Sequence, residues 1–168
     1  FEESICSEFY YAPLYFNAAL VQNMMARNFK QAAVSLTGFV RPLAAAGCTG
    51  SSDATAVMAR RLDNRASESL VGAESLLKKS LELKSDDRSV VIALASLYLS
   101  QNRVRDSAAL FKSMGNDIRG DDPMVLFLEG VMAYQGEEVN VENRMEQARD
   151  KMAEAAGKGS AEATEWVK

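Results

Sequence analysis

The sequence contains no histidine among its 168 residues. Imidazole is the usual side chain for proton transfer near neutral pH and a common metal ligand, so its absence argues against most metal centres and against any mechanism with an imidazole base. Only two cysteines occur, Cys6 and Cys48, too few for a disulfide-built scaffold. We expect both thiols to be reduced and partly buried, and a bridge between them stays open as an alternative.

Long apolar runs and basic stripes are also missing. No run approaches the ~20 apolar residues of a membrane-spanning helix, so we expect no membrane insertion. The 19 basic and 23 acidic side chains give a net charge of −4, and neither half has the basic stripe that a phosphate backbone requires, so we expect no nucleic-acid partner. Acidic residues gather in the C-terminal half, as a solvated surface or as a patch that steers a basic partner. Of the compartments, the cytoplasm is favoured.

Enzymatic motifs are absent from the sequence. It has no glycine-rich phosphate loop and no HExxH motif. Cys48 stands beside glycine, but no histidine exists to activate its thiol. We therefore predict no catalytic residue, no cofactor and no metal. An all-α enzyme with an unfamiliar site is kept as an alternative.

What the sequence does contain is helix-forming residues. It has three prolines and 48% hydrophobic residues, with long stretches of Ala, Leu, Met, Glu, Lys and Arg and no sustained period-two alternation. This composition predicts an all-α fold. Pro13 suits the first turn of a helix. In the N-terminal half we expect helices separated at Asn28, at a loop 47–53 capped by Ser52 or Asp53, and at Asp63–Asn64.

The sequence signals for helix ends and loops are clearer in the C-terminal half. Ser85–Asp87 opens a helix that ends near Gln101–Asn102. Residues 115–122 form a loop leading into Pro123, residues 136–141 form a further connection, and Gly157–Gly159 breaks the chain before a short last helix.

Helices of this length joined by short turns suggest a helical repeat of about 34 residues. Residues 88–119 carry large and small residues at the spacing of the tetratricopeptide pattern: Val91, Leu94, Ala95, Tyr98, Ser107 and Phe111. A weaker match over 13–46 uses Phe16, Ala19, Leu20, Asn23, Ala32 and Leu36. If loop 47–53 is removed, Ala73 falls at the small position of a middle repeat. The chain thus resembles the tetratricopeptide family, and its last segment, with Ala148, Ala155, Ala156 and Gly159, resembles the related Sel1-type repeat.

This resemblance implies a single domain over 1–168, a right-handed superhelix (α-solenoid) of antiparallel helix pairs. The expected repeats are 13–46, 54–87, 88–121 and 122–159, with 47–53 as an inserted loop. Because the chain starts at Phe1, we expect a fragment or a processed product. A generic helical bundle is the alternative.

Members of this family are typically scaffolds, adaptors or chaperones that bind a partner helix or an extended peptide on the concave face. By the resemblance, the apolar partner-binding groove would consist of first-helix residues: Asn17, Val21, Met24, Met25, Ile92, Ser96, Leu99, Phe127, Val131 and Tyr134. Methionine side chains repack around varied shapes, which suits such a groove. Two alternatives are that these residues only pack against neighbouring helices, and that the chain is a structural segment of a longer solenoid in a larger complex, with Trp166 packed on adjoining repeats.

Overall fold

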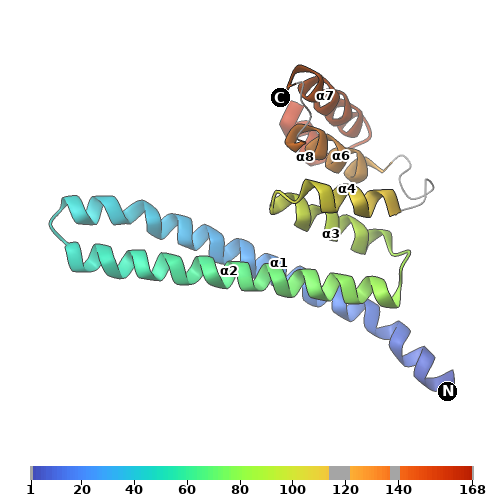
Figure 1. Ribbon diagram of the computed structural model, residues 1–168, viewed down its shortest axis with the longest axis horizontal. Helices are drawn as coiled ribbons and strands as arrows, with labels where there is room; N and C mark the ends of the chain where they lie inside the picture. The colour runs from blue at the N-terminus through green and yellow to red at the C-terminus, as the bar shows by residue number, and fades with distance from the viewer. Residues whose placement is uncertain (1, 114–121, 137–140, 168) are drawn as a thin grey trace. The chain divides into compact units, whose positions relative to one another are not determined.

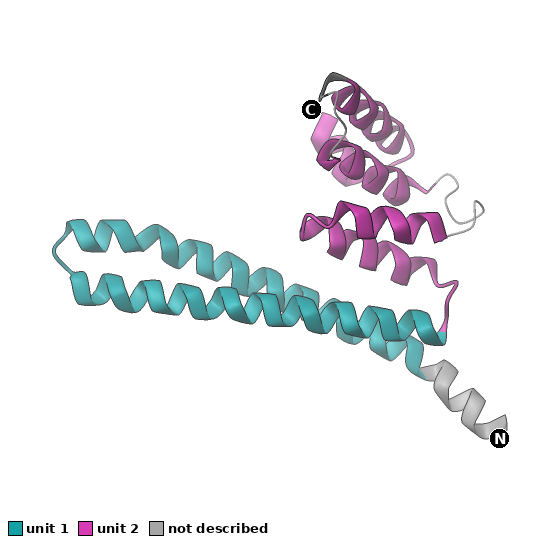
Figure 2. Ribbon diagram, in the orientation of Figure 1, with its two compact units in different colours: residues 1–83 teal, residues 84–168 magenta. Residues whose placement is uncertain are grey.

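The computed structural model describes residues 2–113, 122–136 and 141–167, and all regular secondary structure in these ranges is α-helical (Figure 1). The predicted all-α class is confirmed. Where the sequence led us to expect one domain, the chain divides into two compact units, residues 1–83 and residues 84–168 (Figure 2). We call them the hairpin unit and the C-terminal unit.

The hairpin unit consists of two long antiparallel helices, α1 (Glu2–Ala45) and α2 (Thr49–Leu83), which pack along their length. Glycine ends the first of them, because Gly47 has a positive φ of 79° that a residue with a side chain rarely adopts. The Cys48 amide then donates to the Leu43 carbonyl over 2.9 Å, which closes the helix end. The chain therefore reverses within a few residues.

Because α2 begins at Thr49, the predicted loop 47–53 is wrong, and so is the predicted cap at Ser52 or Asp53. Both residues lie inside α2, where Ser52 is buried. The sequence Gly-Ser-Ser-Asp is typical of loops, but the helix cap formed by Gly47 already completes the reversal and leaves these residues free to be helical.

The predicted turns at Asn28 and Asp63–Asn64 are also wrong, since α1 and α2 run through them. Asparagine or aspartate inside a helix costs about 0.7 kcal/mol relative to alanine, and neither site is followed by the Gly or Pro that would stop a helix. Pro13 lies inside α1 and not at its first turn. Residues 13–46 and 54–87 therefore do not form two separate helix pairs; they supply the two sides of one hairpin.

The two helices meet along a line of small buried residues that recur at heptad spacing, which we call the alanine seam. In α1 these residues are Ala12, Ala19, Ala26 and Ala33. In α2 they are Ser52, Ala59, Ala66, Ala73 and Ser80. Heptad spacing keeps one stripe of each helix against its partner, and short side chains in that stripe let the two backbones approach closely.

Two serines fix the register of the seam. At one end Ser80 donates its hydroxyl to the Ala12 carbonyl over 2.9 Å, and at the other Ser52 donates to the Val40 carbonyl over 3.0 Å. Both bonds cross from α2 to the backbone of α1. With heptads between them, this register places Ala26 opposite Ala66 and Ala33 opposite Ala59.

The C-terminal unit contains shorter helices: α3 (Arg88–Ser100), α4 (Val104–Ser113), α6 (Pro123–Gln135), α7 (Val141–Gly157) and α8 (Ala161–Val167). Within it α3 packs on α4, α6 on α7 and α7 on α8. One part of its core joins α6, α7 and α8 through buried Leu126, Met152, Ala155 and Ala163.

Helix ends in this unit agree with the sequence predictions wherever they are described. The Asp87 carboxylate caps α3 by accepting from the Ser89 amide at 3.1 Å, and the Asp122 carboxylate caps α6 by accepting from the Met124 amide at 2.7 Å, with Pro123 in the first turn. Gly159 ends α7 with a φ of 98°. Residues 115–121 of the predicted loop 115–122, and residues 137–140 of the predicted connection 136–141, lie outside the described residues.

The length of α1 determines whether Cys6 and Cys48 can form a disulfide within one chain. Cys6 lies near its beginning and Cys48 just beyond its end. At 1.5 Å per residue, the helix separates their backbones by about 60 Å, whereas a disulfide needs Cα atoms within about 7 Å. A bridge within one chain is therefore excluded. Cys48 is free and exposed, so the expectation of a partly buried thiol is wrong for this residue.

Candidate functional site

Beside the seam of small residues, the hairpin unit carries bulky apolar side chains that are exposed or half-buried. On α1 they recur three, four or seven residues apart and so form one stripe, in which Met25 and Phe39 are exposed and Phe29, Leu36 and Leu43 are half-buried. On α2, Met58 and Leu62 stand at the same offsets from the seam and therefore flank the same broad face. Phe39 is 60% exposed and Met58 is 57% exposed. We call this surface the apolar face.

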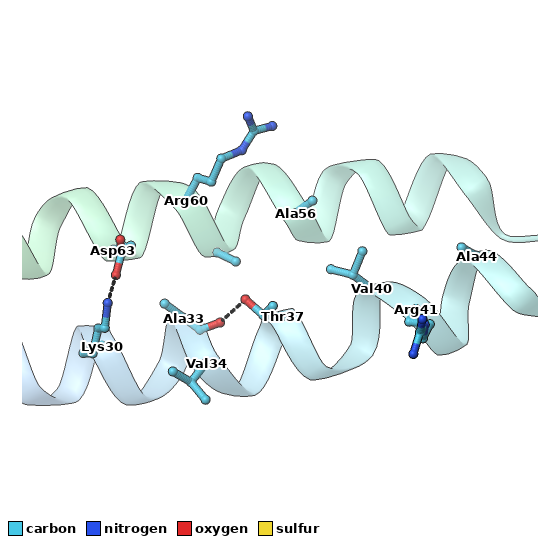
Figure 3. A pocket seen from close by; sticks show the side chains of 11 residues that line it. Lys30, Ala33, Val34, Thr37, Val40, Arg41, Ala44, Ala56, Arg60 and Asp63 are labelled. Atoms are coloured by element: carbon cyan, nitrogen blue, oxygen red, sulfur yellow. Dashed lines mark hydrogen bonds and ion pairs between the residues drawn. The ribbon is translucent and has the colours of Figure 1, made fainter.

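The opposite broad face of the hairpin holds an open groove of about 670 Å³ near the turn (Figure 3). We call it the tip groove. Its floor consists of seam and seam-flanking residues with small side chains: Ala33, Thr37, Val40, Ala44, Ala56 and Ala59. Its rims and one end carry larger ones: Val34, Arg41, Arg60, Lys30 and Asp63. The groove forms because the side chains on this face of the hairpin, close to the turn, are mostly small.

Positive charge dominates the rims of the tip groove. Lys30 and Asp63 form an ion pair that crosses from α1 to α2 at one end. Arg41 on α1 and Arg60 on α2 are exposed, and among the described residues neither has an ion-pair partner. Figure 3 shows the Arg60 side chain extending away from α1. Because neither has an ion-pair partner among the described residues, both guanidinium groups can bind an anionic group at the outer edges of the groove.

Hydrogen-bonding groups are scarce on the groove floor. Among the described residues that line the groove, Thr37 alone has a hydroxyl, and it donates to the Ala33 carbonyl of its own helix over 2.8 Å (Figure 3). The alanine and valine side chains offer methyl groups alone. The groove can therefore receive an apolar surface, with charged groups recognised only at its rims.

The sequence-predicted binding residues of α1 lie elsewhere on the hairpin. Asn17, Val21 and Met24 are exposed on the edge of α1 that faces away from the seam, whereas Met25 belongs to the apolar face. Because α1 continues through the expected turn, these residues do not lie on the first helix of a short helix pair.

Of the predicted binding residues in the C-terminal unit, some are buried in the core and others lie at the surface. Leu99 is buried, and Phe127 and Val131 pack against the core of α6, α7 and α8. Ile92 and Ser96 are half-buried on α3. Tyr134 is half-exposed and meets the ring of Trp166 edge-on, with centroids 6.3 Å apart.

A second hollow, of about 420 Å³, lies beside the turn between α3 and α4 in the C-terminal unit. Its main cation, Arg103, already binds Asp106 at 2.7 Å and stacks over the Tyr98 ring at 4.2 Å. Because these contacts hold the turn together, the hollow is weaker as a binding site than the tip groove.

Sequence reasoning missed both surfaces of the hairpin. The alanine and serine heptads of α1 and α2 were the available signal, since a heptad of small residues predicts two long helices in close contact. Each of Val34, Arg41 and Arg60 comes one residue after a heptad position of the helix interface. Once the seam is known, this spacing places all three on the rims of the groove.

Among the described residues, no cluster of metal-ligating side chains occurs and no helix has the length and hydropathy to cross a bilayer. Comparison with known protein families, curated proteins and solved structures yields no match to this chain. The resemblance to tetratricopeptide and Sel1-type repeats stays a prediction, and the function has to be argued from the surfaces themselves.

Proposed function

We propose that this protein is a non-catalytic interaction module, a scaffold or adaptor, whose hairpin unit binds a helix or an extended peptide of another protein. The observation that carries the proposal is the apolar face. Large apolar side chains on a protein surface are normally covered when they form a contiguous patch. Here exposed Met25, Phe39 and Met58 stand among half-buried apolar neighbours on one face of a helical hairpin, and the described part of this unit has no further helix to cover them.

The dimensions of the face suit a helical partner. From Met25 to Leu43 the stripe extends for about 27 Å along α1 at 1.5 Å per residue, which matches a helix of about 18 residues. A partner helix would lay its own apolar stripe between α1 and α2, in the manner of helix-in-groove recognition. Aromatic and methionine side chains such as Phe39 and Met58 would supply most of the binding energy.

Charged replacements on the apolar face test this function. The double variant F39E/M58E places two carboxylates where a partner would bury apolar surface, and both native side chains are more than half exposed, so the fold should tolerate the change. The control V71E alters a residue that is 68% exposed on a different edge of α2. We expect quantitative recovery of partners from the native source to fall by about tenfold or more for F39E/M58E and to stay unchanged for V71E.

Equal recovery by the wild type and by a folded F39E/M58E variant would rule out the apolar face as the binding surface. A structural role inside a larger assembly is the second candidate, and it is favoured by the exposed outer edge of α1, where Leu14, Val21 and Met24 offer further apolar surface. In that case M24E, and not F39E/M58E, should abolish partner recovery.

A further inference from the structure

We propose that the tip groove is a separate docking site, and that it binds an amphipathic helix of another protein that carries one carboxylate on each flank. The inference rests on the proposed function only in taking the ligand to be a protein. It concerns the face of the hairpin opposite the apolar face and has its own charges and its own test.

The chemistry of the groove favours a helix over an extended peptide. A helix satisfies its own backbone hydrogen bonds and can lay apolar side chains on a floor of methyl groups. An extended peptide would bring unpaired amides and carbonyls against that floor, where the one hydroxyl, on Thr37, is already bonded to Ala33. A third helix in the space between two packed helices is also the arrangement by which small bundles complete their cores.

The rim charges select an acidic ligand. Lys30 is balanced by Asp63 at one end, which leaves Arg41 and Arg60 as a net positive charge, one on each rim. Guanidinium groups bind carboxylates with two parallel hydrogen bonds, so carboxylates on the ligand are the natural counterpart. A second copy of this groove would bring arginine against arginine, which disfavours self-association through this face.

The register of the seam predicts the spacing of those carboxylates. Because Ala33 lies opposite Ala59, Arg60 is level with Ala32, and Arg41 lies about nine residues further along α1, roughly 13 Å at 1.5 Å per residue. Nine residues make about two and a half helical turns. Two side chains about nine positions apart on a ligand helix therefore project from opposite flanks, one toward each rim, while residues between them face the floor.

Fluorescence anisotropy with a designed probe tests the proposal on the full 168-residue chain. The probe is an 18-residue labelled helical peptide with two Glu nine positions apart and Leu on the face between them, and the control peptide has Lys in place of both Glu. We expect R41E and R60E each to weaken binding of the Glu peptide about fivefold, the equivalent of about 1 kcal/mol. The double variant should bind the Lys peptide more tightly than the Glu peptide.

The matched control is R61E, which reverses a charge at the neighbouring position of α2 outside the groove. It should change the affinity by less than twofold. Circular dichroism of each variant checks the fold, and R41Q and R60Q repeat the test without introducing a negative charge.

Three results would overturn the proposal: no binding of the Glu peptide, equal affinity for the Glu and Lys peptides, or an R61E effect as large as that of R60E. A fourth would be dimerisation of the wild-type chain that R41E/R60E abolishes, since the occupant would then be a second copy. Because F39E/M58E leaves the groove intact, it should bind the Glu peptide normally, so failure at one face is distinguishable from failure at the other.

Discussion

Replacing one alanine of the seam by leucine either raises or lowers the stability of the hairpin unit, depending on how closely the two helices approach. Ala26 is 2% exposed, and the register places it opposite Ala66, which is 3% exposed. In a helix pair at the usual separation of about 8–10 Å, a larger apolar residue at a core position fills space and adds stability. In a seam of paired alanines the added isopropyl group has no room, and A26L forces the backbones apart.

The expected cost of A26L follows from overpacking, which is typically about 1–3 kcal/mol. Separation of the helices should also weaken the bonds from Ser52 and Ser80, which reach across the seam to backbone carbonyls. For a unit of this size a loss of about 2 kcal/mol lowers the melting temperature by roughly 10 °C. Thermal unfolding followed by circular dichroism at 222 nm measures this shift.

The control for A26L is A32L, which makes the same chemical change at an exposed position of α1. It should shift the melting temperature by no more than the ordinary effect of a surface substitution, within about 0.5 kcal/mol. An A26L protein that is as stable as the wild type, or more stable, would refute the close seam. Glycine inside a helix itself costs about 0.5–1 kcal/mol relative to alanine, so A26L/A66G should be less destabilised than the sum of the two single variants, because glycine opposite the introduced leucine leaves space for the larger side chain.

Three further predictions concern the ends of the helices and the thiol. Urea unfolding should show that S80A and S52A each lower the free energy of unfolding by about 1 kcal/mol, because each removes a bond across the seam, while S75A, at an exposed position, should change little. G47A should destabilise the protein by roughly 1 kcal/mol, since alanine is strained at a positive φ, whereas G38A, inside α1 with open space around it, should stabilise it by about 0.5–1 kcal/mol. Oxidation followed by peptide mass mapping should find no disulfide between Cys6 and Cys48 within one chain, and Cys48 should react with a thiol reagent without denaturant; an intrachain bridge at high yield would contradict the continuous α1.

The sequence predicted the helical class and the helix ends of the C-terminal unit because these depend on local chemistry. Asp87 and Asp122 are side chains that cap the helix following them, and Gly159 tolerates the backbone that ends a helix. Such signals lie within a few residues of the boundary that they determine.

The hairpin was not predicted because its cause is long-range. Asn28 and Asp63–Asn64 favour turns in isolation, but packing along the whole seam outweighs their modest cost in a helix. The seam pairs residues as distant in sequence as Ala12 and Ser80. Dividing α1 and α2 into short repeats placed Val21 and Met24 in a concave groove, whereas the structure places them on an outer edge and brings Arg41 and Arg60 to a groove instead.

The seam, the apolar face and the tip groove all require that α1 is one continuous helix that does not reverse at Asn28. Spin labels at Asn17 and Ala45, both exposed on α1, report this directly by electron–electron double resonance after the native cysteines are replaced by serine. A continuous helix predicts a distance of about 42 Å between the labelled backbones at 1.5 Å per residue. A distance of about 20 Å or less would show that residues 13–46 fold back as a helix pair, and would contradict the hairpin.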